Sequence, residues 1–339
     1  MDREVTIYDI AKKLKISATT VSRGLNNNSV INSKTREKIH QTAKELGYRH
    51  NTLASSLRKN QSKTIGVLLH EVNSNFSTSV LAGIEKIATA EQYDLLIAHS
   101  AEDYTKEKAN AKNLLSKRID GLIVSLALNT EDVHHFDPFF ERKIPVVFFD
   151  RVINNVKCTK VVIDNFKCGY DATKHLVSQG YKRIAHITAN LTRNVYNDRF
   201  EGYKKALQDK KIPFRDELVK ICSLDKEATI ITVEQLLKLK PDAFFITNDF
   251  AAAVCINLLH TKKIKTPKDI AVFGFNNDVL SDLVTPKLST IDYPGMQMGE
   301  VAAKELIKQL KSSNKKTKSK TITIPSTLII RESTVKTLK

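Results

Sequence analysis

The chain contains 339 residues, 41% of them hydrophobic, which excludes a disordered chain and predicts two or three folded units with a sizeable core. Lysine and arginine outnumber aspartate and glutamate by 54 to 37, and the formal net charge of +17 favours a polyanionic partner or an acidic membrane surface. The four cysteines form no CxxC pair and no apolar run reaches ~18 to 20 residues, which excludes a zinc site, a disulfide framework and a membrane span.

The first 63 residues carry 13 basic and 5 acidic side chains, and their pattern predicts three short helices. Thr6 followed by Asp9 fits a capping box, so a helix is expected to begin there, with an apolar stripe at positions 7, 10, 11 and 14. Ser17 can cap a second helix, and Ser33 can cap a third helix that ends at Gly47. Three short helices separated by turns make a helix-turn-helix domain. A basic module of this kind at one end of a chain favours nucleic acid as its partner.

The second of these helices has an unusual polar face. Its polar side chains recur at i, i+3, i+4 and i+7, away from the apolar stripe, at Thr19, Ser22, Arg23 and Asn26. A guanidinium can donate two hydrogen bonds to O6 and N7 of guanine, so this face suits the major groove of DNA. Alternatively, Arg23 is a solvated surface arginine, and Thr6, Ser17 and Ser33 do no more than cap helices.

Residues 51–58 predict a marginal helix in which Leu53, Ala54 and Leu57 share one face. Eight residues are too few for a helix that is stable alone, so order here is expected only when something packs against it. The polar residues 59–63 form a linker.

From residue 64 onward, short apolar strands alternate with helical stretches. Strands are expected at residues 64–69, 93–98, 121–125, 146–150, 183–188, 243–247 and 270–275, with helices such as 80–90 and 106–117 between them. This alternation predicts parallel sheets with right-handed crossovers. Two sets of units separated near residues 160–164 predict two lobes, with a ligand cleft beyond the carboxyl ends of the strands. The tail holds a lysine-rich run at 311–320, either a solvated loop or a second DNA contact, and a strand-like stretch at 321–331.

Several motifs carry a family resemblance: Val-Thr-Ile-Tyr-Asp-Ile-Ala from residue 5, Ala-Thr-Thr-Val-Ser-Arg from 18, Lys-Thr-Arg-Glu-Lys-Ile from 34, Glu-Leu-Gly-Tyr from 45, Ser-Leu-Arg ahead of Ile-Gly-Val, and Ile-Arg-Glu-Ser at 330–333. Together they resemble the lactose/galactose repressor family of bacterial transcription regulators along almost the whole chain. Members of that family are dimers whose core binds a small molecule and thereby controls DNA affinity. The two-lobed core alone would also resemble a periplasmic sugar-binding protein.

The resemblance implies an all-α helix-turn-helix headpiece joined by a hinge helix to an α/β core of two doubly wound lobes, like those of periplasmic binding proteins. The expected headpiece covers residues 1–48, and the hinge helix and linker cover 49–63. The N-terminal lobe of the core is expected to comprise 64–163 plus 294–320, and the C-terminal lobe 164–293 plus 321–339.

The resemblance also assigns a set of DNA-binding residues. Base reading is implied for Ala18, Thr19 and Arg23, with Ala18 able to offer only a methyl contact to thymine. Phosphate contacts are implied for Thr6, Tyr8, Ser17, Ser22, Asn26 and Thr35, and the expected DNA-binding set also includes Asn51. Leu57 matches the family's wedge leucine, which enters the minor groove at the operator centre and unstacks a base step. Alternatively, Leu57 only packs against the core or the headpiece.

For the effector, the resemblance implies a site between the lobes formed by Phe76, Asp150, Arg199, Asn248 and Asn276. A fork of donors, acceptor oxygens, amides and an apolar platform suits a hydroxyl-rich ligand. Asn276 stands where aspartate is frequent in the family, so the ligand's identity cannot be inherited. Each residue also has a structural alternative: Phe76 in the core, Asp150 ending a strand, Asn248 capping a helix, and Arg199 in an ion pair with Asp198 or Glu201.

We therefore expect a ligand-responsive, sequence-specific transcription regulator, a repressor of carbohydrate-related genes. It is expected to bind a pseudo-palindromic double-stranded operator as a homodimer, with a sugar or sugar derivative as effector. The sequence does not decide between inducer and corepressor, between repressor and activator, or whether a protein co-effector is needed. No signal segment is apparent, so a cytoplasmic protein associated with the nucleoid is expected, without membrane, cofactor or metal.

Two other classes of protein remain as alternatives. The first is a sugar-binding protein without a gene-regulatory role, against which the basic headpiece argues. The second is an enzyme, but the sequence contains no GxGxxG, GxxxxGK[ST], HExxH or GxSxG motif, and no catalytic residue is expected.

Overall fold

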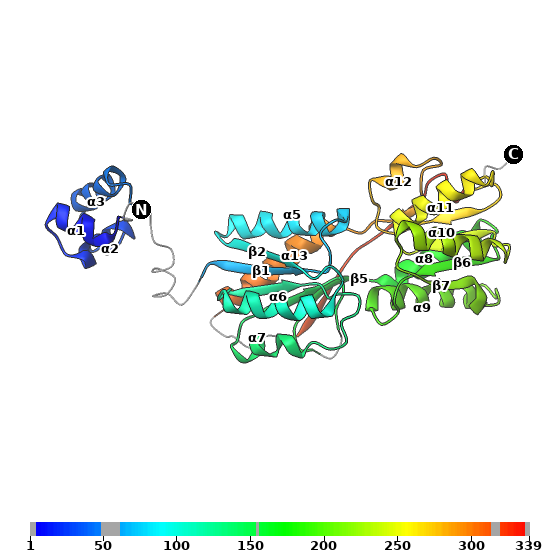
Figure 1. Cartoon of the computed structure of the whole chain (residues 1–339), viewed down its shortest axis with the longest axis horizontal. Helices are drawn as coiled ribbons and strands as arrows, with labels where there is room; N and C mark the ends of the chain where they lie inside the picture. The colour runs from blue at the N-terminus through cyan, green and yellow to red at the C-terminus, as the bar shows by residue number, and fades with distance from the viewer. Residues whose placement is uncertain (1–4, 49–61, 154–155, 313–318, 336–339) are drawn as a thin grey trace. The chain divides into compact units, whose positions relative to one another are not determined.

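The computed structural model describes residues 5–48, 62–153, 156–312 and 319–335, and it divides the chain into two compact units, Met1–Ser62 and Lys63–Lys339. A helical N-terminal unit is followed by an α/β core of two lobes, which confirms these parts of the predicted fold class (Figure 1). The predicted hinge helix at 51–58, with Asn51 and Leu57, lies outside the described residues. Among the helices described, none combines the length and apolar character needed to cross a bilayer.

Three helices form the N-terminal unit, as predicted: α1 (Ile7–Leu14), α2 (Ala18–Leu25) and α3 (Ser33–Glu45). The fully buried side chains of Ile10, Val21 and Ile39, one from each helix, belong to one apolar core. At the start of α1, the Asp9 carboxylate accepts hydrogen bonds from the backbone N and the hydroxyl of Thr6, at 2.8 and 2.7 Å. The α1 and α2 helices have eight residues each, too few to be stable alone. They are therefore stabilised by their capped starts and by the core that they share with α3.

The caps of α2 and α3 differ in how well the sequence predicts them. Ser17 caps α2 as expected, since its Oγ accepts a hydrogen bond of 3.1 Å from the backbone N three residues on. The prediction that Ser33 caps α3 is wrong. Ser33 is already the first helical residue, so the extended residue before it, Asn32, accepts the hydrogen bond from the backbone N of Thr35 at 2.8 Å. Gly47 follows α3 at φ +67°, as expected for a glycine that ends a helix.

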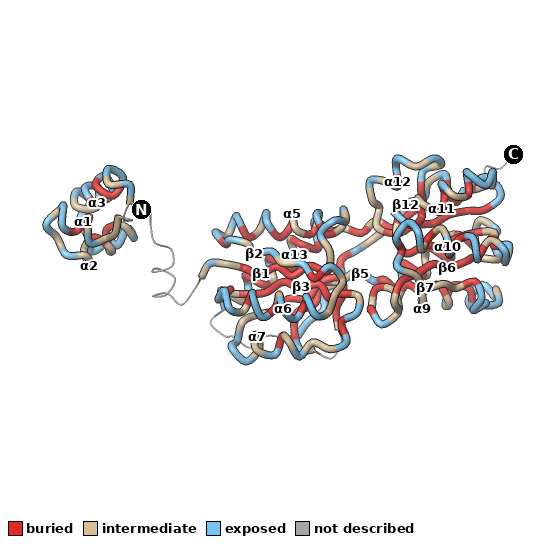
Figure 2. Tube along the Cα trace, viewed as in Figure 1, coloured by how far each residue is buried: buried red, intermediate tan, exposed pale blue. Residues whose placement is uncertain are grey.

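The first lobe of the core contains a parallel sheet of six strands in the order β11-β5-β4-β3-β1-β2. These strands are β1 (Thr64–Leu69), β2 (Asp94–His99), β3 (Gly121–Val124), β4 (Val146–Phe149), β5 (Thr159–Ile163) and β11 (Lys320–Ile324). One face is covered by α5 (Asn75–Ala90) and α13 (Gly295–Lys311), the other by α6 (Tyr104–Ser116), η1 (His134–Phe136) and α7 (Asp137–Glu141). The central strands are buried on both faces (Figure 2), which explains their unbroken apolar runs in the sequence.

The second lobe contains a parallel sheet of four strands in the order β7-β6-β8-β9. They are β6 (Ile184–Thr188), β7 (Val219–Ile221), β8 (Ala243–Ile246) and β9 (Ala271–Phe273). Helices α8 (Asn165–Ser178) and α9 (Asn194–Asp209) cover one face, and α10 (Lys226–Leu237) and α11 (Asp249–Thr261) cover the other. Three shorter elements complete the lobe: η2 (Asp216–Leu218), α12 (Leu280–Leu283) and the antiparallel pair β10 (Thr290–Ile291) and β12 (Leu328–Ile329).

All seven strands expected from the alternation are present, with ends that differ by at most two residues. One predicted lobe boundary is wrong. Residues 321–339 were assigned to the second lobe, but β11 pairs in parallel with β5 in the first sheet, from Lys320 opposite Thr159 to Ile324 opposite Ile163. The chain enters the second lobe only afterwards, at β12. The boundary was misplaced because the stretch 321–331 contains two strands, β11 and β12, and not one. Residues 325–327 between them cross from the first lobe to the second.

Close approach of α8 and α9 positions the middle of α9. A Cβ atom on Gly169 would lie 2.2 Å from the carbonyl oxygen of Arg199, and one on Gly202 would lie 2.1 Å from that of Phe166. Only glycine permits backbone contact at this distance. The helices therefore pack closely enough for Arg199 of α9 to reach Asn165 at the start of α8, where Nε donates to Oδ1 at 2.8 Å.

Candidate DNA-binding surface and ligand site

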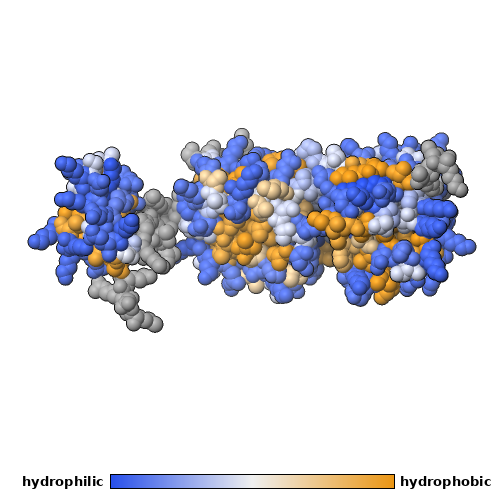
Figure 3. All heavy atoms as spheres, turned by 90° about the horizontal axis from the view of Figure 1, so that it is seen from above, coloured by the Kyte–Doolittle hydropathy of each residue, from blue (hydrophilic) through white to orange (hydrophobic). Residues whose placement is uncertain are grey.

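The polar face predicted for the second helix is present on α2. Thr19 and Arg23 are exposed and lie four residues apart, on the same face. Ser22 is half-buried beside them, and Ala18 packs partly against the core of the unit. In the view of Figure 3, hydrophilic side chains cover most of this unit. A short helix anchored by Val21 therefore presents two polar side chains outward, the arrangement that major-groove reading requires.

The residues expected to contact phosphates are distributed over all three helices. Tyr8 on α1 is 70% exposed, which is unusual for an aromatic side chain and leaves its hydroxyl accessible. Ser17 and Thr6 occupy N-caps, so capping is shown for both, and exposed helix N-termini also suit phosphate oxygens. Thr35 lies in the first turn of α3. Asn26 ends α2, and its Nδ2 donates to the carbonyl oxygen of Ser22 at 2.7 Å.

The charge of the three helices is largely uncompensated. Of their cationic side chains in the described residues, Lys13 pairs with Glu45 at 2.9 Å, which joins α1 to α3. Lys12, Lys34 and Lys38 are exposed and have no carboxylate partner within the described part of the chain. Cations left free in this way can neutralise phosphates without first breaking an ion pair.

Between the two lobes of the core, Tyr293 is the centre of a cluster that the sequence did not single out. Its ring stacks on Phe76 of α5, with centroids 4.4 Å apart, and meets the ring of Phe275 edge-on at 5.8 Å. Its hydroxyl donates to Oδ1 of Asp150, which follows β4. Tyr293 lies on one of the segments that cross between lobes, so it contacts residues from both of them.

Arg199 is the cationic member of the same cluster and is 3% exposed. Its guanidinium lies 3.6 Å from the centroid of the Phe275 ring, and Nη1 donates to the carbonyl oxygen of Thr247 at 3.0 Å. Its partners in the described residues are thus an amide, a carbonyl and aromatic faces, and not Asp198 or Glu201, the ion pairs that the alternative interpretation required. A guanidinium held this way retains donors for a ligand that enters the cluster.

Asp150 is 4% exposed, and burial raises the pKa of its carboxyl, although Arg151 and the hydroxyl of Tyr293 oppose that shift. Its backbone has φ +56°, a conformation that few aspartates adopt. Arg151 donates through Nη1 to both carboxylate oxygens of Glu102, at 2.8 and 2.6 Å, and through Nη2 to the hydroxyl of Tyr196 at 3.3 Å. Asp150 therefore does more than end a strand, because it lies beside a cation that links the two lobes.

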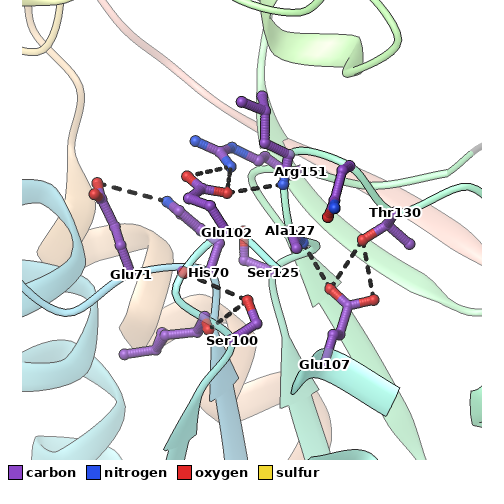
Figure 4. A network of polar contacts seen from close by, with 12 residues as sticks. His70, Glu71, Ser100, Glu102, Glu107, Ser125, Ala127, Thr130 and Arg151 are labelled. Atoms are coloured by element: carbon purple, nitrogen blue, oxygen red, sulfur yellow. Dashed lines mark hydrogen bonds and ion pairs between the residues drawn. The ribbon is translucent and has the colours of Figure 1, made fainter. Parts of the chain in front are cut away.

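A wider polar network surrounds this point at the carboxyl ends of β1 and β3 (Figure 4). His70 is 2% exposed, its Nδ1 lies 2.9 Å from Oγ of Ser125, and burial together with Arg151 lowers its pKa well below the usual value. The fully buried Glu107 accepts hydrogen bonds from the backbone N of Ala127 at 2.6 Å and from the hydroxyl of Thr130 at 3.0 Å. These bonds fix the segments that follow β1 and β3 within the first lobe.

The five predicted effector residues are brought near one another, but their side chains differ in availability. Phe76, Asp150 and Arg199 all contact Tyr293. Asn248 caps α11, since its Oδ1 accepts a hydrogen bond of 2.7 Å from the backbone N three residues on, which is the structural alternative stated above. Asn276 follows Phe275 with φ +115° and bonds to the carbonyl oxygen of Ile291 through its backbone N.

Among the predicted effector residues, the side chains of Phe76, Asp150 and Arg199 meet around Tyr293. A surface hollow of about 560 Å³ lies at the start of α13 instead, and it is lined by Ser79, Asp292, Pro294, Gly295, Met296, Gln297 and Glu300, none of them in the predicted set. A ligand that bonds to Oδ1 of Asp150 would replace the hydrogen bond from Tyr293.

Sequence reasoning missed Tyr293, Phe275, Arg151 and Tyr196. Nothing in their local pattern marks them, since each reaches the site from a loop or a helix start whose position depends on how the lobes meet. Only sequence adjacency could have indicated two of them, because Arg151 follows the predicted Asp150 and Phe275 precedes the predicted Asn276.

Comparison with known proteins gives two family matches. Residues 6–51 match the model described as bacterial regulatory proteins, lacI family, and residues 173–334 match a periplasmic binding protein-like domain. The chain is 31% identical to catabolite control protein A of Priestia megaterium over 97% of this chain and 99% of that protein. It is 29% identical to the ribose operon repressor of Haemophilus influenzae, over 97% of this chain and 98% of that protein.

A solved structure shares the fold along almost the whole chain. The lac repressor dimer bound to operator and the anti-inducer ONPF superposes with a TM-score of 0.87, covering 98% of this chain and 100% of that chain at 23% identity.

Proposed function

The chain belongs to the lacI family of bacterial regulatory proteins, and from that membership we propose that it is a repressor of carbohydrate-related genes whose affinity for DNA is set by a small molecule bound between the core lobes. It is a transcription regulator that binds DNA and a small-molecule effector. It acts as a homodimer on double-stranded operator DNA, and two copies of α2 read the two halves of a pseudo-palindromic site.

The observation that carries this proposal is the pairing of two features in one chain. A compact helical unit exposes Thr19 and Arg23 on a short anchored helix, and a two-lobed core holds Arg199 and Asp150 in a polar and aromatic cluster where its lobes meet. A sugar-binding protein without a regulatory role would need only the second feature. The first feature favours a regulator over that alternative.

For DNA, the proposed roles follow from exposure. Arg23 reads guanine and Thr19 lies one turn before it, whereas the partly packed Ala18 offers a methyl group. Thr6, Tyr8, Ser17, Ser22, Asn26 and Thr35 bind phosphates, which fix the register of the unit without reading sequence. Asn51 and Leu57 complete the proposed set from outside the described residues.

For the effector, we propose a hydroxyl-rich ligand that replaces the contact between Tyr293 and Asp150. Arg199 donates to ligand oxygens, Asp150 accepts from hydroxyls, and Phe76 with Tyr293 provides an apolar platform. Asn276 contributes an amide, and Asn248 contributes its Nδ2 while Oδ1 continues to cap α11. A ligand that separates Tyr293 from Asp150 favours a different arrangement of the lobes and so shifts a two-state equilibrium.

Selection of duplexes from a random library by the full-length protein tests the DNA-binding half of this proposal. We expect the recovered sequences to share an inverted repeat and Arg23→Ala to abolish the enrichment. Recovery of sequences without any common motif would contradict it. The protein is proposed not to be an enzyme, and turnover of any sugar by the pure protein would contradict that part.

A screen of sugars, sugar derivatives and nucleosides for ligands that raise the thermal unfolding temperature tests the effector half. We expect at least one such ligand, and we expect Arg199→Ala to lose the shift. A ligand that stabilises wild type and Arg199→Ala equally would place the effector elsewhere.

A further inference from the structure

A row of cations lies along the edge of the first sheet at which its parallel strands begin. We define the basic row as Lys63 before β1, Lys117 and Arg118 before β3, Arg142 and Lys143 before β4, and Lys157 before β5. All six side chains are exposed, and none has a carboxylate ion pair among the described residues. The four strands concerned are neighbours in the sheet, in the order β5-β4-β3-β1.

Backbone hydrogen bonds fix the register of this edge. The N of Asp120 donates to the carbonyl oxygen of Thr64 at 2.8 Å, and the N of Leu122 donates to that of Pro145 at 2.9 Å. The residues just before β1, β3 and β4 are therefore side by side. Strands lie about 4.8 Å apart, so the basic row extends over roughly 15 Å across four strands.

The carboxylates at the same edge do not cancel this charge. That of Glu91 pairs with Lys311 at 2.6 Å, and that of Asp120 accepts from the backbone N of Lys63 at 2.9 Å. The backbone bond to Asp120 leaves its charge in place, so Asp94, Asp120 and Glu141 remain as carboxylates against six cations among the described residues next to the strand starts. A single-sign field along an edge of this length is suited to a linear polyanion.

The presence of exposed cations does not by itself distinguish this end of the core from the other as a DNA-binding surface. The α6 and α7 helices end at the basic row, and the dipoles of helix C-termini favour cations without any partner. The strand starts of the second sheet, at the opposite end of the core, also carry exposed lysines, including Lys182, Lys238, Lys240 and Lys263. What distinguishes the two ends is the connection to the helical unit. The chain enters the core at Lys63, which is itself part of the basic row.

We propose that the basic row binds the phosphodiester backbone of DNA held by the helical unit, independently of base sequence. This proposal rests on the proposed function, since it needs DNA bound by α2. The residues 49–62 span at most about 50 Å when fully extended, which limits how far bound DNA can be from Lys63. DNA carries one negative charge per ~1.7 Å of its axis, so a row of ~15 Å faces several phosphates.

The test compares two matched variants of the full-length protein. The row variant carries Lys117→Gln, Arg118→Gln, Arg142→Gln and Lys143→Gln, and the control variant carries Lys182→Gln, Lys238→Gln, Lys240→Gln and Lys263→Gln. Each variant loses four positive charges, and each includes two residues with left-handed backbone. Thermal unfolding establishes that both are folded. Binding to a fluorescent mixed-sequence duplex of about 40 base pairs is then measured as a function of KCl concentration.

We expect the slope of log affinity against log salt to become shallower by about 2 to 4 in the row variant, because each phosphate contact contributes about 0.9. The control variant should keep the wild-type slope and bind within about twofold of wild type. Equal losses in both variants would show an effect of total charge and would overturn the proposal. An unchanged row variant would also overturn it, provided that Lys34→Gln with Lys38→Gln weakens binding.

The same experiment separates this proposal from the proposed function. If the wild-type protein does not bind the duplex at all, that result contradicts the proposed DNA-binding function. If the wild-type protein binds and the row variant binds equally well, that result contradicts only the proposal about the basic row. Vesicles containing phosphatidylserine serve as a second probe. Loss of vesicle binding in the row variant, with duplex binding unchanged, would identify a membrane surface as the partner and overturn the assignment to DNA.

Discussion

At the scale of single residues, Asp249 shows how the second lobe holds a carboxylate out of water. It is 1% exposed at the start of α11, and its oxygens accept hydrogen bonds from the hydroxyl of Thr290 at 2.7 Å and from the backbone N of Asp278 at 2.8 Å. Burial raises its pKa to about 6 in spite of these bonds. The loop after β9, which carries Asn276, is therefore anchored to a group that titrates close to neutral pH.

Replacing Asp249 by asparagine should change the pH dependence of stability. The folded-state pKa lies above that of an unfolded aspartate, so the folded chain binds the proton more tightly and the free energy of unfolding falls as pH rises from about 4 to about 6. Two pKa units correspond to about 3 kcal/mol, an upper limit for this residue. The difference between wild type and Asp249→Asn, measured by urea unfolding at several pH values, should show this fall.

The exposed Asp225 provides a control, because its effect on the free energy of unfolding should change with pH in the opposite direction to that of Asp249. A hydrogen bond from Ser223 lowers the pKa of Asp225, so its contribution to stability is lost as pH falls through the folded-state pKa. A difference between wild type and Asp249→Asn that does not vary with pH would show that Asp249 titrates normally.

Substitution of Arg23 should separate charge from base reading. Lysine keeps the charge but cannot form the bidentate contact with guanine, so Arg23→Lys should weaken binding to the selected site by about 1 to 3 kcal/mol, or roughly 5- to 150-fold. Binding to mixed-sequence DNA should change little, because phosphate contacts remain. Competition between the two duplexes measures the ratio of the affinity for the selected site to the affinity for mixed-sequence DNA. An equal loss of affinity for both duplexes would show that Arg23 contacts phosphates.

The residues of the ligand site were only partly predictable. Phe76, Asp150 and Arg199 could be named because they lie in or beside stretches that resemble the family, and all three do converge. Tyr293 could not be named, since Arg199, Asp150 and Phe76 are 94, 143 and 217 residues away from it in the sequence and its position follows from the crossing between lobes. The cap at Asn32 was missed for a local reason, because Asn32 and Ser33 are adjacent and both favour that position.

At the scale of elements, the packing of α8 on α9 determines where Arg199 lies. Gly169→Ala would place a Cβ atom 2.2 Å from the carbonyl oxygen of Arg199, so the two backbones must separate. We expect a loss of about 1 to 3 kcal/mol in the free energy of unfolding, as for other overpacked cores, although alanine favours the helix more than glycine does. The separation should also weaken ligand binding, because it moves Arg199 away from Asn165.

Lys174→Ala provides the control for Gly169→Ala, because Lys174 lies on the exposed side of the same helix. It should leave both unfolding and ligand binding close to wild type. If Gly169→Ala were as stable as Lys174→Ala, the close approach of the two helices would not be needed for the fold.

The elements themselves were predictable where the apolar pattern is long. Most of the buried strands show long apolar runs, and the alternation with helices correctly indicated parallel sheets. The buried β5 was not expected, because it begins with Thr159 and Lys160. The β7 strand was not predictable, since it has three residues and one of them, Ile221, is 57% exposed. The placement of β11 was predicted wrongly, because a strand that pairs with a partner more than 150 residues away leaves no local signal.

At the scale of the whole molecule, the lobes are joined by contacts that a ligand can rearrange. Asn194 at the start of α9 binds the backbone of the other lobe twice, as Nδ2 donates to the carbonyl oxygen of Asp150 and Oδ1 accepts from the N of Val152, both at 3.0 Å. Arg193 beside it donates to the carbonyl oxygen of Thr130. These bonds favour the present arrangement of the lobes without any ligand.

Asn194→Ala should shift the lobes toward a more open arrangement, because both hydrogen bonds are lost together. We expect a larger radius of gyration in solution scattering without ligand, and a change in ligand affinity of roughly 5- to 30-fold if the two bonds contribute about 1 to 2 kcal/mol together. An unchanged radius and unchanged affinity would show that the lobes are held by other contacts.

The central claim is that occupancy between the lobes controls DNA binding, and the most direct measurement is operator affinity with and without a stabilising ligand. We predict that a ligand found by thermal shift changes the affinity for the selected duplex by at least fivefold, in either direction, and that Arg199→Ala, still folded and still binding DNA, shows no such change. An operator affinity that stays constant while the ligand saturates the wild-type protein would contradict the account.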